Sequence, residues 1–226
     1  VKAARSIAVQ QINTLTSIAI RLISKKQLSK IADIDVPFRA QMADKFYTIL
    51  RGLFDFGKTQ VQREIRAQKG TELLADKVPL NPMDMALIEE FLKARSKASA
   101  MTLALKLKNF ITYESLKQIK EGMVSAPALK QGLLDLSDRE LLATAKYSVS
   151  EAFNWGRGNG AEEMADDIDR VQYSALLDKN TCEVCEPLDG EEWEFDDERT
   201  DYYSSGNPAC LGGGRCRCMV VYIAKE

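Results

Sequence analysis

The chain has 226 residues, 45% of them hydrophobic and 28% charged, with five cysteines and no histidine. This composition is typical of a folded protein with a substantial core and argues against wholesale disorder. No run of about 18 apolar residues occurs, so we expect no membrane span and no membrane partner.

The first 70 residues predict two helices. Apolar residues recur at helical spacing from Val1 to about Ala32, without glycine or proline. A second helix is expected from about Pro37 to Lys69, with an apolar face between Phe38 and Phe54 and Gly70 as its stop.

Two further helices are expected before residue 156. Asn81 and Pro82 form an N-terminal cap signal, and the helical pattern that follows ends at Gly122. Ser137 and Glu140 have the spacing of a capping box, so another helix is expected to begin there and run toward Trp155.

Glycine-rich sequence at 156–160 then predicts a break before a short helical stretch, Ala161 to Asp169. Beyond Arg170 the pattern alternates or becomes β-branched, which predicts strands at 171–175, 192–195 and 219–223. The expected fold is mainly α with a small C-terminal β-rich module, an α+β protein.

Charge divides the chain in two. Residues 1–158 carry 25 Lys and Arg against 16 Asp and Glu, a net +9, whereas residues 159–226 carry 6 against 17, a net −11. We therefore predict a helical, partner-binding region at 1–158, within which 1–80 could form an arm, and a separate module at 159–226. Solvated surface on both parts is an equally good reading of this charge pattern.

All five cysteines lie in the last 45 residues, as Cys182-x2-Cys185-x24-Cys210-x5-Cys216-x-Cys218. A Cys-x-x-Cys turn aims two thiolates at one tetrahedral ion, and structural zinc takes four such ligands. We expect a zinc site formed by Cys182, Cys185, Cys210 and either Cys216 or Cys218.

Three other interpretations of these cysteines remain: a redox pair, a disulfide, or buried free thiols. The redox motif expects a βαβ context, which the pattern lacks. No catalytic site is expected, because without histidine there is no Ser-His or Cys-His pair, and no phosphate-binding loop motif occurs. The acidic run from Glu191 to Asp201 is expected to be a solvated loop.

The cysteine region resembles the Mu F-like family of phage head morphogenesis proteins. The resemblance rests on the string Asp-x-x-Thr-Cys-x-x-Cys-x-x-Leu-Asp-Gly at 178–190 and on the terminal Cys-Arg-Cys at 216–218. It is clear over 170–222 and weaker over 116–169. Many members have a histidine shortly before Cys-Arg-Cys; here Cys210 stands in its place.

This resemblance implies a minor virion protein, present in several copies around the portal vertex of the capsid after assembly in the host cytoplasm. Its partners would be the portal protein and other head proteins, with packaged DNA as a further candidate, and its role head morphogenesis and genome ejection. The alternative from the residues alone is a nucleic-acid-binding zinc ribbon that uses the basic helical region, because the acidic module has the wrong sign for phosphate.

Overall fold

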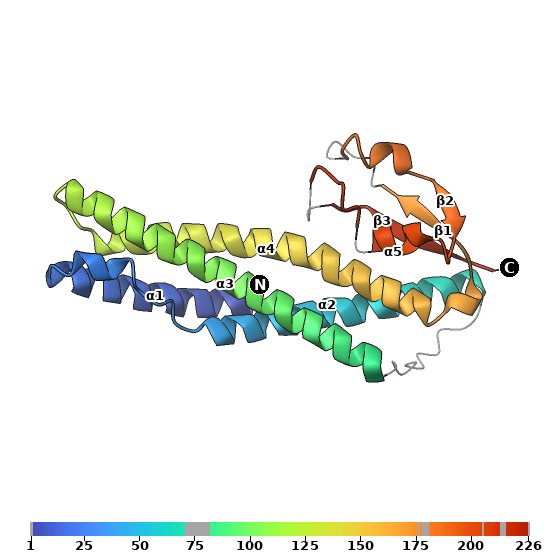
Figure 1. Cartoon of the computed structure of the whole chain (residues 1–226), viewed down its shortest axis with the longest axis horizontal. Helices are drawn as coiled ribbons and strands as arrows, with labels where there is room; N and C mark the ends of the chain where they lie inside the picture. The colour runs from blue at the N-terminus through green and yellow to red at the C-terminus, as the bar shows by residue number, and fades with distance from the viewer. Residues whose placement is uncertain are drawn as a thin grey trace. The chain divides into compact units, whose positions relative to one another are not determined.

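The computed structural model describes residues 2–70, 82–175, 177, 181–204, 206–212 and 216–225. It is mainly α, with a small antiparallel sheet in the C-terminal part, which confirms the expected fold class (Figure 1). The long helices are α1 (Lys2–Ser24), α2 (Arg39–Gln68), α3 (Pro82–Lys120) and α4 (Ala126–Glu162). The shorter elements are η1 (Leu28–Ile31), η2 (Ala165–Asp167), β1 (Ile168–Ser174), η3 (Glu186–Leu188), β2 (Glu192–Glu194), α5 (Glu198–Ser204) and β3 (Met219–Ala224).

The N-terminal helices differ from the prediction at their ends. α1 stops at Ser24, because Lys26 takes a left-handed backbone conformation with φ of 56°, and only the short η1 follows. α2 begins two residues after Pro37, since Phe38 is also left-handed. The predicted stops at Gly70 and Gly122 are confirmed by their φ angles of 63° and 76°. Asn81, the expected cap of α3, lies outside the described residues.

The expected start of the fourth helix was wrong. Ser125 caps α4 instead, accepting a hydrogen bond from the Ala128 N–H at 3.3 Å, and the helix runs through Ser137 without interruption. Ser137 is buried inside the helix. The glycines at 156–160 lie in the same helix, so the predicted break there is also wrong. The predicted helical stretch at 161–169 gives way to η2 and to β1, which begins at Ile168.

Packing divides the chain into two compact units. Unit 1 comprises residues 1–48 and 86–145, and unit 2 comprises residues 49–85 and 146–226. The predicted boundary between residues 158 and 159 falls inside α4. These two units are defined by contacts within the fold. The predicted assignment of partner binding to residues 1–158 and of metal binding to residues 159–226 stays a prediction.

Unit 1 is a bundle of helical segments from α1, α2, α3 and α4 around an apolar core. Its fully buried residues include Ile12, Leu15, Met42, Leu107 and Leu129. On its surface Arg5 pairs with Asp138 at 2.6 Å and Lys106 pairs with Glu140. The bundle is therefore held mainly by apolar contacts between helices.

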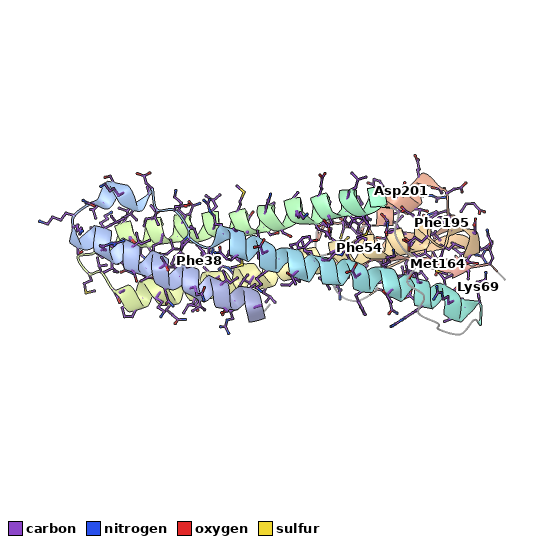
Figure 2. All side chains as sticks on the ribbon, turned by 90° about the horizontal axis from the view of Figure 1, so that it is seen from below. Phe38, Phe54, Lys69, Met164, Phe195 and Asp201 are labelled. Carbon is purple, nitrogen blue, oxygen red and sulfur yellow. The ribbon has the colours of Figure 1, made fainter. Side chains whose placement is uncertain are left out.

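Unit 2 is built on the sheet, with strand order β2-β1-β3 and antiparallel pairing throughout. All three predicted strands are present. Val171 lies opposite both Trp193 and Tyr222, and all three side chains are buried. This inner face shares its core with Val61 and Ile65 of α2, with Ala161 of α4 and with Met164 just after that helix, which Figure 2 labels. The sheet thus depends on helices from outside the C-terminal segment for its core.

In unit 2, α2 and α4 approach until their backbones touch. A Cβ added at Gly156 would lie 2.1 Å from the carbonyl oxygen of Phe54, and one at Gly57 would lie 2.1 Å from that of Phe153. Gly160 is in similar contact with Lys58. The glycine-rich segment is therefore a helix contact surface and does not interrupt the helix.

Neighbouring positions on the same α4 turns hold strand β3. Arg157 is 3% exposed; its Nη1 pairs with Glu64 of α2 at 2.7 Å, and its Nη2 donates to the Val220 carbonyl at 3.3 Å. Asn154 Nδ2 donates to the Cys218 carbonyl at 3.5 Å. At the end of α2, Gln68 hydrogen-bonds the Tyr222 carbonyl and the Ala224 N–H. Helix contacts thereby fix the position of β3 and of Cys218 just before it.

We predict that Gly156→Ala destabilises the protein by about 1–3 kcal/mol, because the new methyl group overlaps the Phe54 carbonyl. Gly52→Ala, in the same unit and in α2, is the matched control, since no atom lies within 4 Å of its added Cβ. That control should stabilise by about 0.5–1 kcal/mol through helix propensity. Urea unfolding measures both changes, and equal stabilisation by the two substitutions would refute the close contact.

Candidate metal centre

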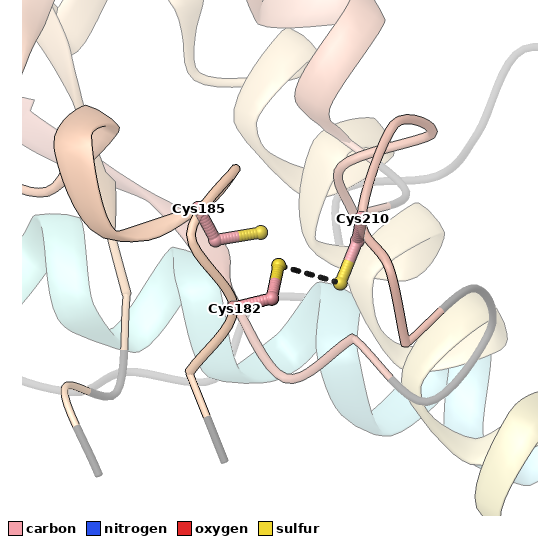
Figure 3. Close-up of side chains that lie close together, drawn as sticks. All are labelled: Cys182, Cys185 and Cys210. Carbon is pink, nitrogen blue, oxygen red and sulfur yellow. Dashed lines mark hydrogen bonds between the residues drawn. The ribbon is translucent and has the colours of Figure 1, made fainter. Parts of the chain in front are cut away.

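The first cysteine pair lies in a tight turn. The N–H groups of Cys185 and Glu186 both donate to the Cys182 carbonyl at 3.0 Å, and η3 continues directly from this turn. The turn orients the Cys182 and Cys185 side chains toward the same region of space, as Figure 3 shows. The Cys-x-x-Cys segment therefore has the local form that the metal interpretation requires.

The end of η3 ties this turn to β1. Asp189 Oδ1 accepts the Ala175 N–H at 2.7 Å, and the Gly190 N–H donates to the Tyr173 carbonyl at 2.9 Å. Gly190 has a φ of 80°, which a residue with a Cβ rarely adopts. The Leu-Asp-Gly part of the motif is thus a structural turn that sets the position of the cysteine pair.

Asn207 connects the second cysteine group to the first. It is 4% exposed; its Oδ1 accepts the Ala209 N–H at 2.9 Å, and its Nδ2 donates to Cys185 Sγ at 3.5 Å. The Gly212 N–H donates to Cys210 Sγ at 3.3 Å. Such N–H donors to sulfur stabilise thiolates and orient them as ligands.

The five sulfur atoms form two triads that share Cys185. Cys182, Cys185 and Cys210 form one, and Cys185, Cys216 and Cys218 form the other, with all sulfurs of a triad within 4.8 Å of one another. Cys182 Sγ lies 3.6 Å from Cys210 Sγ (Figure 3). Ligands of a tetrahedral ion with bonds of about 2.3 Å are about 3.8 Å apart, so this separation fits a shared ion. A disulfide would bring the sulfurs to about 2.05 Å.

Each triad contains one thiol whose pKa is lowered. A hydrogen bond from the Leu211 backbone is the main cause that lowers the pKa of Cys182 to about 6. Burial raises the pKa of Cys216, but backbone hydrogen bonds from Asn207 and Cys218 outweigh it and leave that pKa lowered. Burial raises the pKa of Cys185 and that of Cys210. Burial also raises the pKa of Cys218, to about 12. A bound cation would offset the repulsion between thiolates this close together and so favour the ionised form of all of them.

A buried hydroxyl completes the site. Tyr173 is 1% exposed, and its hydroxyl, which lies against Cys185 and Cys218, has no hydrogen-bond partner of good geometry among the described residues. Burial raises its pKa, so the hydroxyl stays protonated and can donate. A metal-bound thiolate is a better acceptor than a neutral thiol, so the orphaned donor fits a metal-loaded cluster.

All five predicted site residues therefore meet in one cluster that could hold a metal ion. Cys216 adjoins Cys210 and Cys218 adjoins Cys185, so each is placed to be the fourth ligand. Sequence reasoning gave no role to Asn207, Tyr173 or Asp189. The turn-forming dipeptide Asn207-Pro208 was the one signal that could have identified the first of these.

The predicted acidic loop contains a short helix, α5. Asp197 pairs with Arg199 at 2.7 Å, and this hydrogen-bonded pairing lowers its pKa to about 2. Thr200 accepts a hydrogen bond from the Trp193 indole at 2.9 Å. The segment therefore has ordered contacts with β2, and its carboxylates line one side of a cavity of about 310 Å³ that also includes Trp155 and Tyr222.

Comparison of the chain with protein-family models, with curated proteins and with solved structures found no match. Among the described residues, no helix is both long and apolar enough to cross a membrane.

We predict that Asn207→Asp weakens metal binding by about 10- to 100-fold, the usual effect of losing a partner of a metal ligand. The substitution keeps the shape but replaces the donor to Cys185 by a negative charge. Asn109→Asp, which adds the same charge at an exposed position of α3, should leave the affinity unchanged. Competition with a chromophoric chelator measures both, and equal affinities in the two variants would contradict the assigned role.

Proposed function

We propose that this chain is a minor head protein of a tailed phage, with one structural zinc ion bound by its cysteine cluster. The observation that supports this proposal best is that two parts of the family-like motif, far apart in sequence, lie close together in space. The Cys-x-x-Cys pair and the Cys-Arg-Cys segment are more than 30 residues apart in sequence, and their sulfurs lie in overlapping triads. A motif whose halves meet at a candidate metal centre has a physical reason for its spacing.

Zinc is the proposed ion because the ligand set is all sulfur. Thiolates select soft or borderline ions over magnesium and calcium, and tetrahedral all-sulfur sites hold zinc or iron. Four thiolates leave no open position for a substrate, so the ion would act structurally, and no enzymatic role is proposed. The ion would fasten the segments that carry the cysteines to the sheet, whose buried face already packs on α2 and α4.

The role in the particle follows from the resemblance. The helices would dock onto the portal protein and other head proteins, in several copies around the portal vertex, and act in head morphogenesis and genome ejection. The net charge of +9 on residues 1–158 leaves contact with packaged DNA as a further role of the same region.

We predict one zinc ion per chain in protein purified under reducing conditions. Cys182→Ser and Cys185→Ser should each lower the zinc content to well below one, because each removes a ligand. Cys216→Ser and Cys218→Ser, made one at a time, should lower it unequally and so identify the fourth ligand. Elemental analysis gives the metal content, and near-ultraviolet circular dichroism reports on Trp193 beside the cluster.

The fold of the helices provides the control. Far-ultraviolet circular dichroism should change little in these variants, because none of the substituted side chains lies in one of the four long helices. A fully folded wild-type protein with far less than one metal ion per chain would show that the cysteines are only buried thiols.

The particle assignment has its own test. In particles of the phage or prophage that encodes this chain, quantitative mass spectrometry should find the protein in a few copies per head. Deletion of its gene should yield defective or non-infectious heads. Absence of the protein from both proheads and mature particles would reject the virion role and leave the zinc assignment intact.

A further inference from the structure

Helix α3 has a second apolar face. Six of its large apolar side chains are between 43% and 67% exposed. They are Leu87, Phe91, Met101, Leu105, Tyr113 and Leu116. At 100° per residue these positions fall within one third of the helix circumference, and the exposed residues Ala94 and Ala98 occupy the same sector between them. We call this set of eight residues the α3 stripe.

The opposite side of α3 is already used. Ile88, Leu92, Leu103, Leu107 and Ile111 are all at most 3% exposed, and the last three belong to the core of unit 1. The stripe is therefore separate from the face that folds the bundle. From Leu87 to Leu116 it extends about 44 Å along the helix. Thr102, Asn109 and Thr112 lie in the same sector, so the strip is mainly apolar. An exposed, mainly apolar strip of this length is characteristic of an interaction surface.

Charges along the stripe indicate the kind of partner. Between Leu87 and Leu116 the helix has five lysines and arginines and three glutamates, a net charge of +2. At 100° per residue, the charged residues that border the stripe are mostly basic: Arg95, Lys97, Lys106 and Lys108, with Glu90 as the one acidic residue. Lys97, Lys106 and Lys120 are exposed. Pairing two copies of this chain through α3 would bring two such basic helices together, which like-charge repulsion opposes. An acidic surface would be attracted instead.

We infer that the α3 stripe binds an amphipathic helix whose apolar side is bordered by aspartate and glutamate, presented by another protein. The inference rests on the proposed docking of the helices to head proteins, and it names the surface and the chemistry of the partner. Apolar anchors at helical spacing accept a partner helix by interlocking side chains. Met101, unbranched and flexible, can adapt to the shape of the incoming residues.

The test uses the full-length, zinc-loaded protein and a labelled synthetic peptide. The peptide has about 25 residues, spans about 38 Å as a helix, and carries leucines on one side with glutamates beside them. A second peptide of the same pattern has lysines in place of the glutamates. Fluorescence anisotropy should show binding of the glutamate peptide that weakens as salt rises, and binding of the lysine peptide should be weaker by about tenfold or more.

Variants locate the binding surface. Met101→Glu combined with Leu105→Glu should weaken binding by about tenfold or more without changing the helical content, because both side chains are exposed. Leu142→Glu is the matched control: it changes an exposed leucine of α4 in the same unit and should bind as the wild type does.

Other occupants would give different results. Equal binding of the two peptides, or equal loss in the double variant and in Leu142→Glu, would overturn the inference. Binding to vesicles of anionic lipid without binding to the glutamate peptide would assign the stripe to a membrane surface. A dimer in sedimentation that the double variant abolishes would assign it to a second copy. None of these results depends on whether the protein is found in particles.

Discussion

The backbone contact between α2 and α4 is the constraint on which unit 2 depends. Gly57 and Gly156 allow the two helices to touch, and this contact sets the position of the α4 turns that carry Asn154 and Arg157. Those two side chains hydrogen-bond the carbonyls of Cys218 and Val220. The arginine is buried with its charge opposed by Glu64 and its guanidinium over the Tyr222 ring, so few other side chains could replace it. The position of the second cysteine group thus follows from a helix contact about 60 residues earlier in the chain.

This dependence limits the role that the metal can have in folding. A segment of fewer than 60 residues would be too small to fold on its own core, and zinc would then supply most of its stability. In the structure the inner face of the sheet packs on Val61, Ile65 and Met164, so apolar burial already stabilises β1 and β3. The proposed ion has the narrower task of joining the two segments that carry the cysteines. Loss of the ion should then be a local event, with the sheet and helices retained.

The sequence predicted which helices and strands form better than it predicted where they begin and end. It also predicted that the cysteines cluster, but not which residues contact them. Strands at 171–175, 192–195 and 219–223 were identified because β-branched and alternating residues reflect one buried face. The prediction that Ser137 caps a helix was wrong, because a buried serine inside a helix can have the same neighbours in sequence as a capping serine. Only tertiary packing distinguishes the two cases. The glycines at 156–160 predicted a break because helix propensity depends on the local sequence alone, and it does not include the close contact with α2 that these glycines allow. Cysteine spacing predicted the cluster, but Tyr173 and Asn207 act through contacts between distant segments, which spacing does not encode.

The α3 stripe also affects the protein before any partner is present. A helix with apolar residues on both sides gives a weak periodic signal, and during synthesis either side can join the growing core. Once the bundle has formed, a strip about 44 Å long still meets water. At high concentration such a surface favours irregular association, which the lysines and arginines beside it oppose through repulsion. The lysines would therefore keep the free protein in solution until the oppositely charged helix arrives, and co-expression with that helix should raise the soluble yield.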